Sequence, residues 1–197
     1  MSRHNLVAVV DLETLGKSAG AVIASIGVVI VDVGQRMGIV DEFYSRVALS
    51  QGRLREADTL AWWEQQKVKN PEAWVEVFSS GARPSLHYVL EALAKFLGRH
   101  FDQVGPVELM GNGSEFDNVL LADAYDKWGI EQPWQFRGNQ SLRTAVWMGR
   151  KLLDIDPKYD LQFEGIQHHA LHDARHEAKY LLHIMGAFKK AIAGEGS

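Results

Sequence analysis

The feature that most constrains this chain is an apolar strand that runs directly into two acidic residues. Leu6–Asp11 is short, apolar and rich in β-branched residues, as a buried strand is, and Glu13 follows two positions after Asp11. Successive side chains on a strand alternate between its faces, so Asp11 and Glu13 project from the same face. Two carboxylates held together in apolar surroundings repel each other and favour a cation between them. The pattern therefore predicts a metal-binding pair on a sheet, the alternative interpretation being a solvent-exposed strand end.

Two further segments predict strands that pair with the first. Ala21–Asp32 is enriched in valine and isoleucine, and Ile39–Val47 alternates between apolar and polar residues. The connections are short, which favours an antiparallel meander of three strands. A short strand is expected at Val107–Met110, where it enters the turn Gly111-Asn-Gly113.

Helices follow these strands. Asp58-Thr59 is a candidate N-cap, Asn70-Pro71 a break or restart, and Pro84-Ser85 the start of an amphipathic helix that runs to about His100. Three later helices are expected at Glu115 to about Trp128, Ser141–Leu153 and about His169 to Ala193. Segment 154–167 is expected to be a loop. This order predicts an α/β fold in which a mixed sheet is flanked by helices.

Length and composition bound the remaining possibilities. The 197 residues fit a single domain over 1–197, with 194–197 expected to be a flexible tail. A net charge of −4 is not that of a protein that coats nucleic acid, although it fits an enzyme that grips a few nucleotides around bound cations. The absence of cysteine excludes disulfides and cysteine-based zinc sites. The polar N-terminus and interrupted apolar runs predict a cytoplasmic location without a signal peptide or membrane contact.

Two more acidic residues lie at predicted helix starts. Asp117 follows the Gly111-Asn-Gly113 turn, with Ser114 as the expected cap and Phe116 as an expected core anchor. Favourable interaction with a helix dipole is the alternative explanation for Asp117. Asp173 lies in the first turns of the last helix, and His168 comes just before that helix. A neutral histidine at such a position can take a proton from water.

A zinc site is the competing interpretation of the histidines. His168, His172 and His176 are spaced four apart and could line one helix face. No cysteine is available as a further ligand, which makes this interpretation the less favoured one. His172 and His176 are instead expected on the solvated surface of the helix.

Taken together, Asp11-x-Glu13, Phe116-Asp117 and His168-x4-Asp173 resemble the three exonuclease motifs of the DEDD superfamily, in its DEDDh (DnaQ-like) branch. The order and separations agree, and the resemblance spans nearly the whole chain. A narrower resemblance, to small phage-type and mycobacterial 3′→5′ exonucleases and exoribonucleases, is carried by Asp11-Leu-Glu-Thr-Leu-Gly16, Ala24-Ser-Ile-Gly27, Asp58-Thr-Leu-Ala-Trp-Trp63, Gly111-Asn-Gly113 and Leu142-Arg-Thr144. Those enzymes share a ribonuclease H-like fold. The double tryptophan separates them from proofreading subunits.

Three positions depart from the narrower group. Ser141 and His172 stand where aspartate is often found, and Glu177 stands where glutamine is common. None of the three is one of the four acids or His168. We therefore expect them to affect substrate preference and not the chemistry.

The resemblance implies a 3′→5′ exonuclease that hydrolyses single-stranded DNA or RNA from a free 3′ end with two divalent ions, Mg²⁺ or Mn²⁺. It implies that Asp11 bridges both ions, that Glu13, Asp117 and Asp173 complete their ligands, and that His168 is the general base. The backbone around Thr14 and Leu15 is expected to hold the terminal nucleotide.

Candidate base-stacking side chains are Leu15, Phe116, Trp62 and Trp63. Adjacent positions on a helix cannot face the same way, so we expect one tryptophan in the core and at most one at the site. The tryptophan-bearing segment is also a candidate homodimer interface.

Three alternatives stay open at this stage. They are a proofreading exonuclease subunit of a polymerase, a non-catalytic module that binds nucleic acid, and a metal-dependent hydrolase of small nucleotides. The choice between DNA and RNA depends on contacts to the 2′-hydroxyl, which the sequence does not place.

Overall fold

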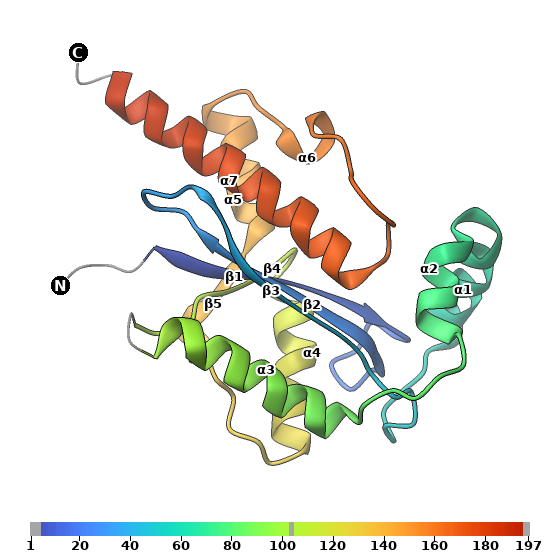
Figure 1. Cartoon of the computed structure of the whole chain (residues 1–197). Helices are drawn as coiled ribbons and strands as arrows, with labels where there is room; N and C mark the ends of the chain where they lie inside the picture. Colours follow the sequence, from blue (N-terminus) through green and yellow to red (C-terminus); the bar gives the residue numbers. More distant parts are fainter. Residues whose placement is uncertain (1–4, 103–104, 195–197) are drawn as a thin grey trace.

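The computed structural model describes residues 5–102 and 105–194 and is built around one five-stranded sheet with the order β3-β2-β1-β4-β5. Strands β1 (Leu6–Thr14), β2 (Ile23–Asp32) and β3 (Gly38–Arg46) form an antiparallel meander. Strand β4 (Leu109–Gly111) pairs with β1 in parallel, and β5 (Asn139–Ser141) pairs with β4 in parallel (Figure 1). The predicted mixed sheet, three antiparallel strands followed by parallel ones, is confirmed.

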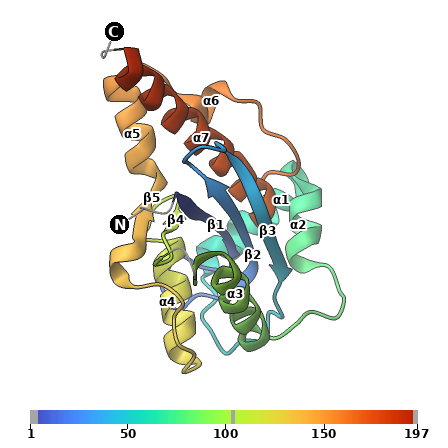
Figure 2. The same cartoon turned by 60° about the vertical axis from the view of Figure 1, so that its left-hand side comes forward.

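Helices cover both faces of the sheet (Figures 1 and 2). One face carries α3 (Leu86–Phe101) and α4 (Asp117–Lys127), and the other carries α5 (Leu142–Leu152) and α7 (Ala170–Gly194). No helix within residues 5–102 and 105–194 has the length and apolar character needed to cross a membrane.

The remaining helices lie at the ends of these layers. Helices α1 (Ala57–Lys69) and α2 (Pro71–Phe78) pack together beside the end of β1 (Figure 1). Two short elements, η1 (Phe136–Gly138) and α6 (Pro157–Asp160), belong to connecting segments.

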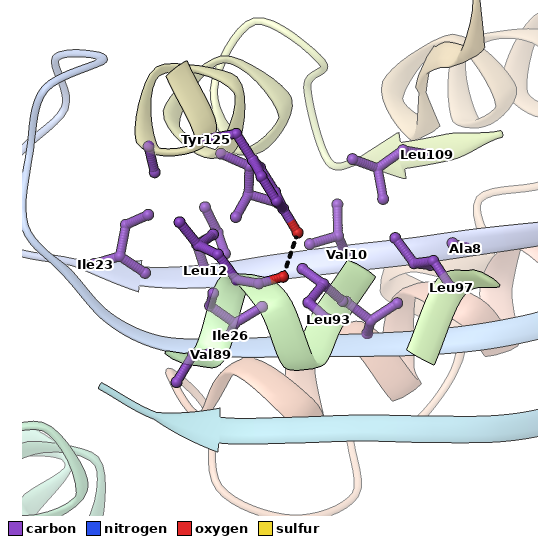
Figure 3. Packing of buried hydrophobic residues seen from close by; sticks show 14 of the residues in the cluster. Ala8, Val10, Leu12, Ile23, Ile26, Val89, Leu93, Leu97, Leu109 and Tyr125 are labelled. Atoms are coloured by element: carbon purple, nitrogen blue, oxygen red, sulfur yellow. Dashed lines mark hydrogen bonds between the residues drawn. The ribbon is translucent and has the colours of Figure 1, made fainter. Parts of the chain in front are cut away.

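Strand β1 is buried on both of its faces. Ala8, Val10 and Leu12 belong to the core beneath α3 and α4, which Figure 3 shows with Tyr125 donating to the carbonyl of Leu90 at 2.8 Å. Val7 and Val9 point the other way, into the core beneath α5 and α7. This double burial explains the nearly continuous apolar run in the sequence.

Several predicted element boundaries require correction. Helix α1 begins at Ala57 without a side-chain cap, so the Asp58-Thr59 cap is wrong. Helix α4 begins at Asp117 with Phe116 at its N-cap, which moves its start past the predicted Ser114 cap. At Ser85 the predicted cap is confirmed, because its hydroxyl accepts from the Tyr88 amide at 3.3 Å.

Other differences concern short or terminal segments. Strand β4 begins at Leu109 instead of Val107, and neither β5 nor α6 was predicted. The break at Asn70-Pro71 is a restart, with Pro71 opening α2. Gly194 is the last residue of α7 and not part of a tail, and residues 195–197 of the predicted tail lie outside the described residues.

Candidate active site

The two acids of β1 lie within its last four residues. Both side chains continue the alternation of Val7 and Val9, so they face the layer of α7. Glu13 is 8% exposed, and Asp11 is half-buried. The pairing of β1 with β2 shifts register directly after Glu13, at Thr14. Regular pairing with β2 therefore includes both acidic residues and ends directly after them.

Gly27 brings the start of α7 onto the sheet beside Asp11. It lies opposite Asp11 in the pairing of β1 with β2. A Cβ at this position would lie 2.3 Å from the backbone carbonyl of Ala170, so only glycine lets the helix backbone approach this closely. Three residues further along α7, Asp173 places a carboxylate oxygen within 4.8 Å of oxygens of Asp11 and Glu13.

Asp117 reaches the same region from α4. It is the first residue of that helix and is only 3% exposed. Nearby backbone amides, its own and those of Leu12 and Asn112, favour its charged carboxylate. At Gly111, a Cβ would lie 2.9 Å from the Cβ of Asp117, so this glycine allows the helix start to pack against β4. Asp117 is not within the 4.8 Å group, but its charge acts on both β1 acids.

The electrostatics of these carboxylates fit a cation site. Burial, together with the neighbouring carboxylates, raises the pKa of Asp11 and of Glu13 well above the ordinary value. Burial also raises the pKa of Asp117 to about 7 and that of Asp173 to about 6. Crowded carboxylates of this kind are stabilised by divalent cations, whose preferred ligands are oxygens. The residues present therefore fit the metal ions that the sequence resemblance implies.

A fifth carboxylate, Glu177, lies in the same cluster. It is 4% exposed on α7, four residues after Asp173. Among the charges acting on Asp11, that of Glu177 raises its pKa most. The sequence places Glu177 outside the four acids of the motifs, and the structure brings it beside them. The available signal was its spacing from Asp173, because residues four apart share a helix face.

His168 is held in place immediately before α7. Its φ is +63°, in the left-handed region that few non-glycine residues adopt. The Asn70 side chain donates to the carbonyl of Gln167 at 2.5 Å, which ties this segment to the junction of α1 and α2. The backbone amide of His169 donates to Asp173 Oδ2 at 3.0 Å, so the histidine segment and the acid are joined directly.

The imidazole of His168 packs edge-on against two tryptophans. Its ring centroid lies 4.9 Å from that of Trp62 and 6.5 Å from that of Trp63. Burial lowers the pKa of His168, which favours the neutral ring at neutral pH. A neutral ring nitrogen can accept a proton, as a general base must.

The other histidines do not join His168 in a zinc site. His172 Nδ1 accepts from the Ile166 amide at 3.0 Å, and His176 Nε2 faces the Lys158 carbonyl at 3.4 Å. Within residues 5–102 and 105–194, the acids Asp11, Glu13 and Asp173 form the one set of three metal-binding side chains that meets. The zinc interpretation therefore has no support in the geometry. Both histidines are half-buried, whereas the sequence placed them on solvated surface.

The candidate substrate residues divide into buried and accessible ones. Leu15 and Trp63 are 0% and 1% exposed, so in this structure neither side chain offers a surface to a base. Trp63 instead donates from Nε1 to the Thr14 carbonyl at 2.9 Å, which braces the end of β1. Phe116 is half-buried against the core. Trp62 is 36% exposed, as expected if only one of the two tryptophans lies in the core.

Trp62 and Thr14 line a cavity of about 540 Å³ at the end of β1. The cavity lies between the segment that follows β1 and one side of α1. Its lining is formed by Thr14, Gly16, Lys17, Asp58, Thr59, Ala61, Trp62 and Gln65.

The fold is shared with known nucleases. The nuclease domain of 3'hExo, a DEDDh family member bound to rAMP, matches with a TM-score of 0.65 and 13% identity over 94% of each chain. Exonuclease X, in complex with 5' overhanging duplex DNA, matches with a TM-score of 0.54 and 20% identity over 91% of each chain. E. coli Exonuclease I, in complex with a dA16 oligonucleotide, has a TM-score of 0.60 and 12% identity over 89% of this chain and 40% of that one. These similarities define the class as a ribonuclease H-like exonuclease fold.

The sequence itself gives the family. Residues 7–185 match the family described as 3'-5' exoribonuclease Rv2179c-like domain. The chain belongs to this family and is a 3′→5′ exonuclease, which confirms the predicted membership of the exoribonuclease-like group. A search among curated proteins found no sequence match.

Proposed function

We propose that this exonuclease removes nucleotides from the free 3′ end of single-stranded RNA with two divalent ions, Mg²⁺ or Mn²⁺. The observation that carries the proposal is the meeting of Asp11, Glu13 and Asp173 oxygens within 4.8 Å, with Asp117 beside them. RNA is favoured over DNA because the matching family is described as an exoribonuclease domain. The 3'hExo structure bound to rAMP supports the same choice.

Asp11, Glu13, Asp117 and Asp173 would hold the ions. When bound, two divalent ions activate an attacking water and stabilise the charge that develops on the phosphate and on the leaving 3′ oxygen. Of the four acids, Asp11 is the one that would contact both ions, because the charges of Glu13, Asp117 and Asp173 all act on it. The acids come from β1, α4 and α7, so the packed fold, and not a mobile loop, fixes their relative positions.

His168 accepts the proton of the attacking water in this proposal. Its lowered pKa keeps the ring neutral at neutral pH, and the edges of Trp62 and Trp63 restrict its orientation. The hydrogen bond from the neighbouring His169 amide to Asp173 keeps this segment next to a proposed metal ligand. These contacts support a general base in a fixed position.

The cavity beside Thr14 is the proposed site of the terminal nucleoside. Its volume of about 540 Å³ is within the range of small-molecule sites. Trp62 offers an aromatic surface on which a base can stack, and Lys17 offers a positive charge to a phosphate. Phe116 and the backbone at Leu15 stay predictions for the same nucleotide.

Digestion of 5′-labelled oligonucleotides tests the proposal directly. Single-stranded RNA, DNA of the same sequence and both duplexes would be incubated with Mg²⁺ or Mn²⁺, with Asp11→Asn as the inactive control. We expect the RNA strand to shorten stepwise from its 3′ end and the DNA strand to shorten more slowly. Faster loss of DNA would overturn the assignment to RNA. Cleavage of dinucleotides without loss of any polymer would indicate a hydrolase of small nucleotides.

A homodimer is a further part of the proposal. Helix α1 exposes Trp62 and Val68, the latter at 83%, and aromatic and apolar residues of this kind are enriched at interfaces. Light scattering on the purified protein would give the mass, and a monomer at micromolar concentration would contradict the dimer.

A further inference from the structure

Glu177 is a buried acid outside the four-acid set. It lies one helical turn beyond Asp173 on the face of α7 that packs against the sheet, between the fully buried Ala174 and Ala178. With 4% of its surface exposed, it is almost entirely removed from bulk solvent. A carboxylate in such a position costs folding free energy unless a partner compensates for its lost hydration.

One oxygen of Glu177 lacks a compensating group. The Oε2 atom is buried and has no hydrogen-bond partner among the described residues. The Asn112 side chain, in the turn between β4 and α4, and the positive charge of Lys158 both favour the charged form of the carboxylate. No described residue forms an ion pair with Glu177.

Glu177 lies among the carboxylates of this cluster, whose charges act on it. Its own charge interactions are with Asp117 and Asp173, and Asp11 feels Glu177 more strongly than it feels any other acid. The buried hydroxyl of Tyr180, which also finds no partner within residues 5–102 and 105–194, is subject to the charges of Glu177 and Asp11. An unpartnered carboxylate oxygen within a group of metal-binding carboxylates has the chemistry of a further oxygen ligand.

We propose that Glu177 is a fifth carboxylate of the metal centre, with its unpartnered Oε2 serving as an additional ligand for a divalent ion held at Asp11. The inference rests on the proposed function, because it assumes that Asp11 holds a metal. It assigns a metal-binding role to a position that the sequence motifs leave out. The alternative is a purely structural Glu177, protonated and buried whether or not metal is present.

Mn²⁺ binding in the absence of nucleic acid separates these possibilities. Calorimetry and the electron paramagnetic resonance of free Mn²⁺ would be applied to the unchanged chain and to Glu177→Gln, which keeps the shape and removes the charge. We expect Glu177→Gln to weaken Mn²⁺ binding about 10- to 100-fold, the usual loss on removing a group that supports a metal site. Glu164→Gln is the matched control, because Glu164 is exposed and pairs with Lys179 at 2.6 Å. It should bind Mn²⁺ as the unchanged chain does.

The outcomes distinguish this inference from the proposed function. If the unchanged chain binds Mn²⁺, Asp11→Asn loses it and Glu177→Gln keeps full affinity, then only the role of Glu177 is overturned. If the unchanged chain binds no Mn²⁺, the two-metal proposal fails and this inference fails with it. Glu177→Met, which removes both oxygens at similar volume, is measured in parallel. If neither Glu177→Gln nor Glu177→Met unfolds cooperatively, Glu177 has a purely structural role and the proposed metal-binding role is overturned.

Discussion

The two faces of β1 end in opposite ways. On the face beneath α3 and α4, the alternation Ala8, Val10, Leu12 stays apolar to the end of the strand. On the face beneath α7, Val7 and Val9 are followed by Asp11 and Glu13. Both faces are covered by helices, so burial by itself does not distinguish them. On the first face the buried atoms are apolar and pack against one another. On the second face they include carboxylates, which need a cation.

This comparison separates stability from chemistry within one strand. The apolar face stabilises the fold by removing carbon atoms from water. The acidic face gathers carboxylates whose pKa values are raised by burial, which opposes folding at neutral pH until a cation binds. Because the two faces share a backbone, the packing of the first fixes the positions of the acids on the second. Substitutions on the two faces should therefore have different consequences.

The largest effect is expected at Asp11. Asp11→Asn should lower nuclease activity by about 1000-fold or more, because the metal-bound phosphate loses its main electrostatic support. Without metal, the variant should unfold at the same temperature as the unchanged chain or higher. Leu12→Ala on the opposite face should instead cost about 2–5 kcal/mol of stability. Activity assays and thermal unfolding of both variants make the comparison, and a folded, active Asp11→Asn would refute the site.

The next largest effect is expected at His168. His168→Ala should reduce kcat by about 100- to 10,000-fold, the range for loss of a general base. His172→Ala provides the matched control, since His172 accepts from the Ile166 amide and has no proposed part in the reaction. Rates at saturating RNA would be measured for both. Equal losses at the two positions would remove the assignment of His168 as the base.

A smaller effect is expected at Gly27, which links the acidic face to α7. Gly27→Ala forces a Cβ onto the Ala170 carbonyl and should cost about 1–3 kcal/mol of stability. Activity should fall further than the loss of folded protein explains, because Asp173 moves with the helix start. Gly38→Ala is the control, because a Cβ there meets its nearest atom at 3.7 Å. An unchanged rate in folded Gly27→Ala would show that the contact does not position Asp173.

The smallest effect is expected in the pH dependence of stability without metal. The folded-state pKa is about 7 for Asp117 and about 6 for Asp173, above the value near 4 of an unfolded carboxyl. The folded chain thus keeps protons that the unfolded chain releases. The stability linked to these protons is fully present below about pH 4 and is lost as pH rises to about 7.

Thermal unfolding in EDTA at about pH 5 and about pH 8 measures this difference. The unfolding temperature should be lower at the higher pH, and Mg²⁺ should restore it there. Asp117→Asn should flatten the dependence, since an amide does not titrate. An Asp117→Asn profile that parallels the unchanged chain would mean that Asp117 ionises normally.

Much of the fold could be predicted because its strongest elements carry local signals. The buried strands are β-branched runs, and α3 has both a capping serine and a regular apolar face. Strand β5 has neither, because Asn139–Ser141 is short and polar and forms a strand only through pairing with β4. The start of α4 was misplaced for a similar reason. Its position depends on how closely Gly111 lets Asp117 approach, which is a tertiary contact.

The candidate site was predicted to a similar extent. Alternation on β1 places Asp11 and Glu13 on one face, and the resemblance supplies Asp117, Asp173 and His168. The spacing of Glu177 from Asp173 indicates a shared helix face, but the depth at which that face meets the sheet depends on how α7 packs. Leu15 is buried and Trp62 is partly exposed. This difference in exposure likewise depends on the packing of α1 and α2 against the end of β1.

The close contact at Gly27 makes the first residue of α7 the pivot of any tilt of this helix. The helix has 25 residues and is therefore about 37 Å long. Along the helix axis, Asp173 lies only about 4.5 Å from this pivot, and Glu177 lies about 10 Å from it. A tilt of about 10° would swing the far end by about 6 Å and displace Asp173 by about 1 Å. Disturbances at the distal half of the helix are thus attenuated before they reach the acids, so crowding or substitution there should leave the hydrolytic geometry nearly intact.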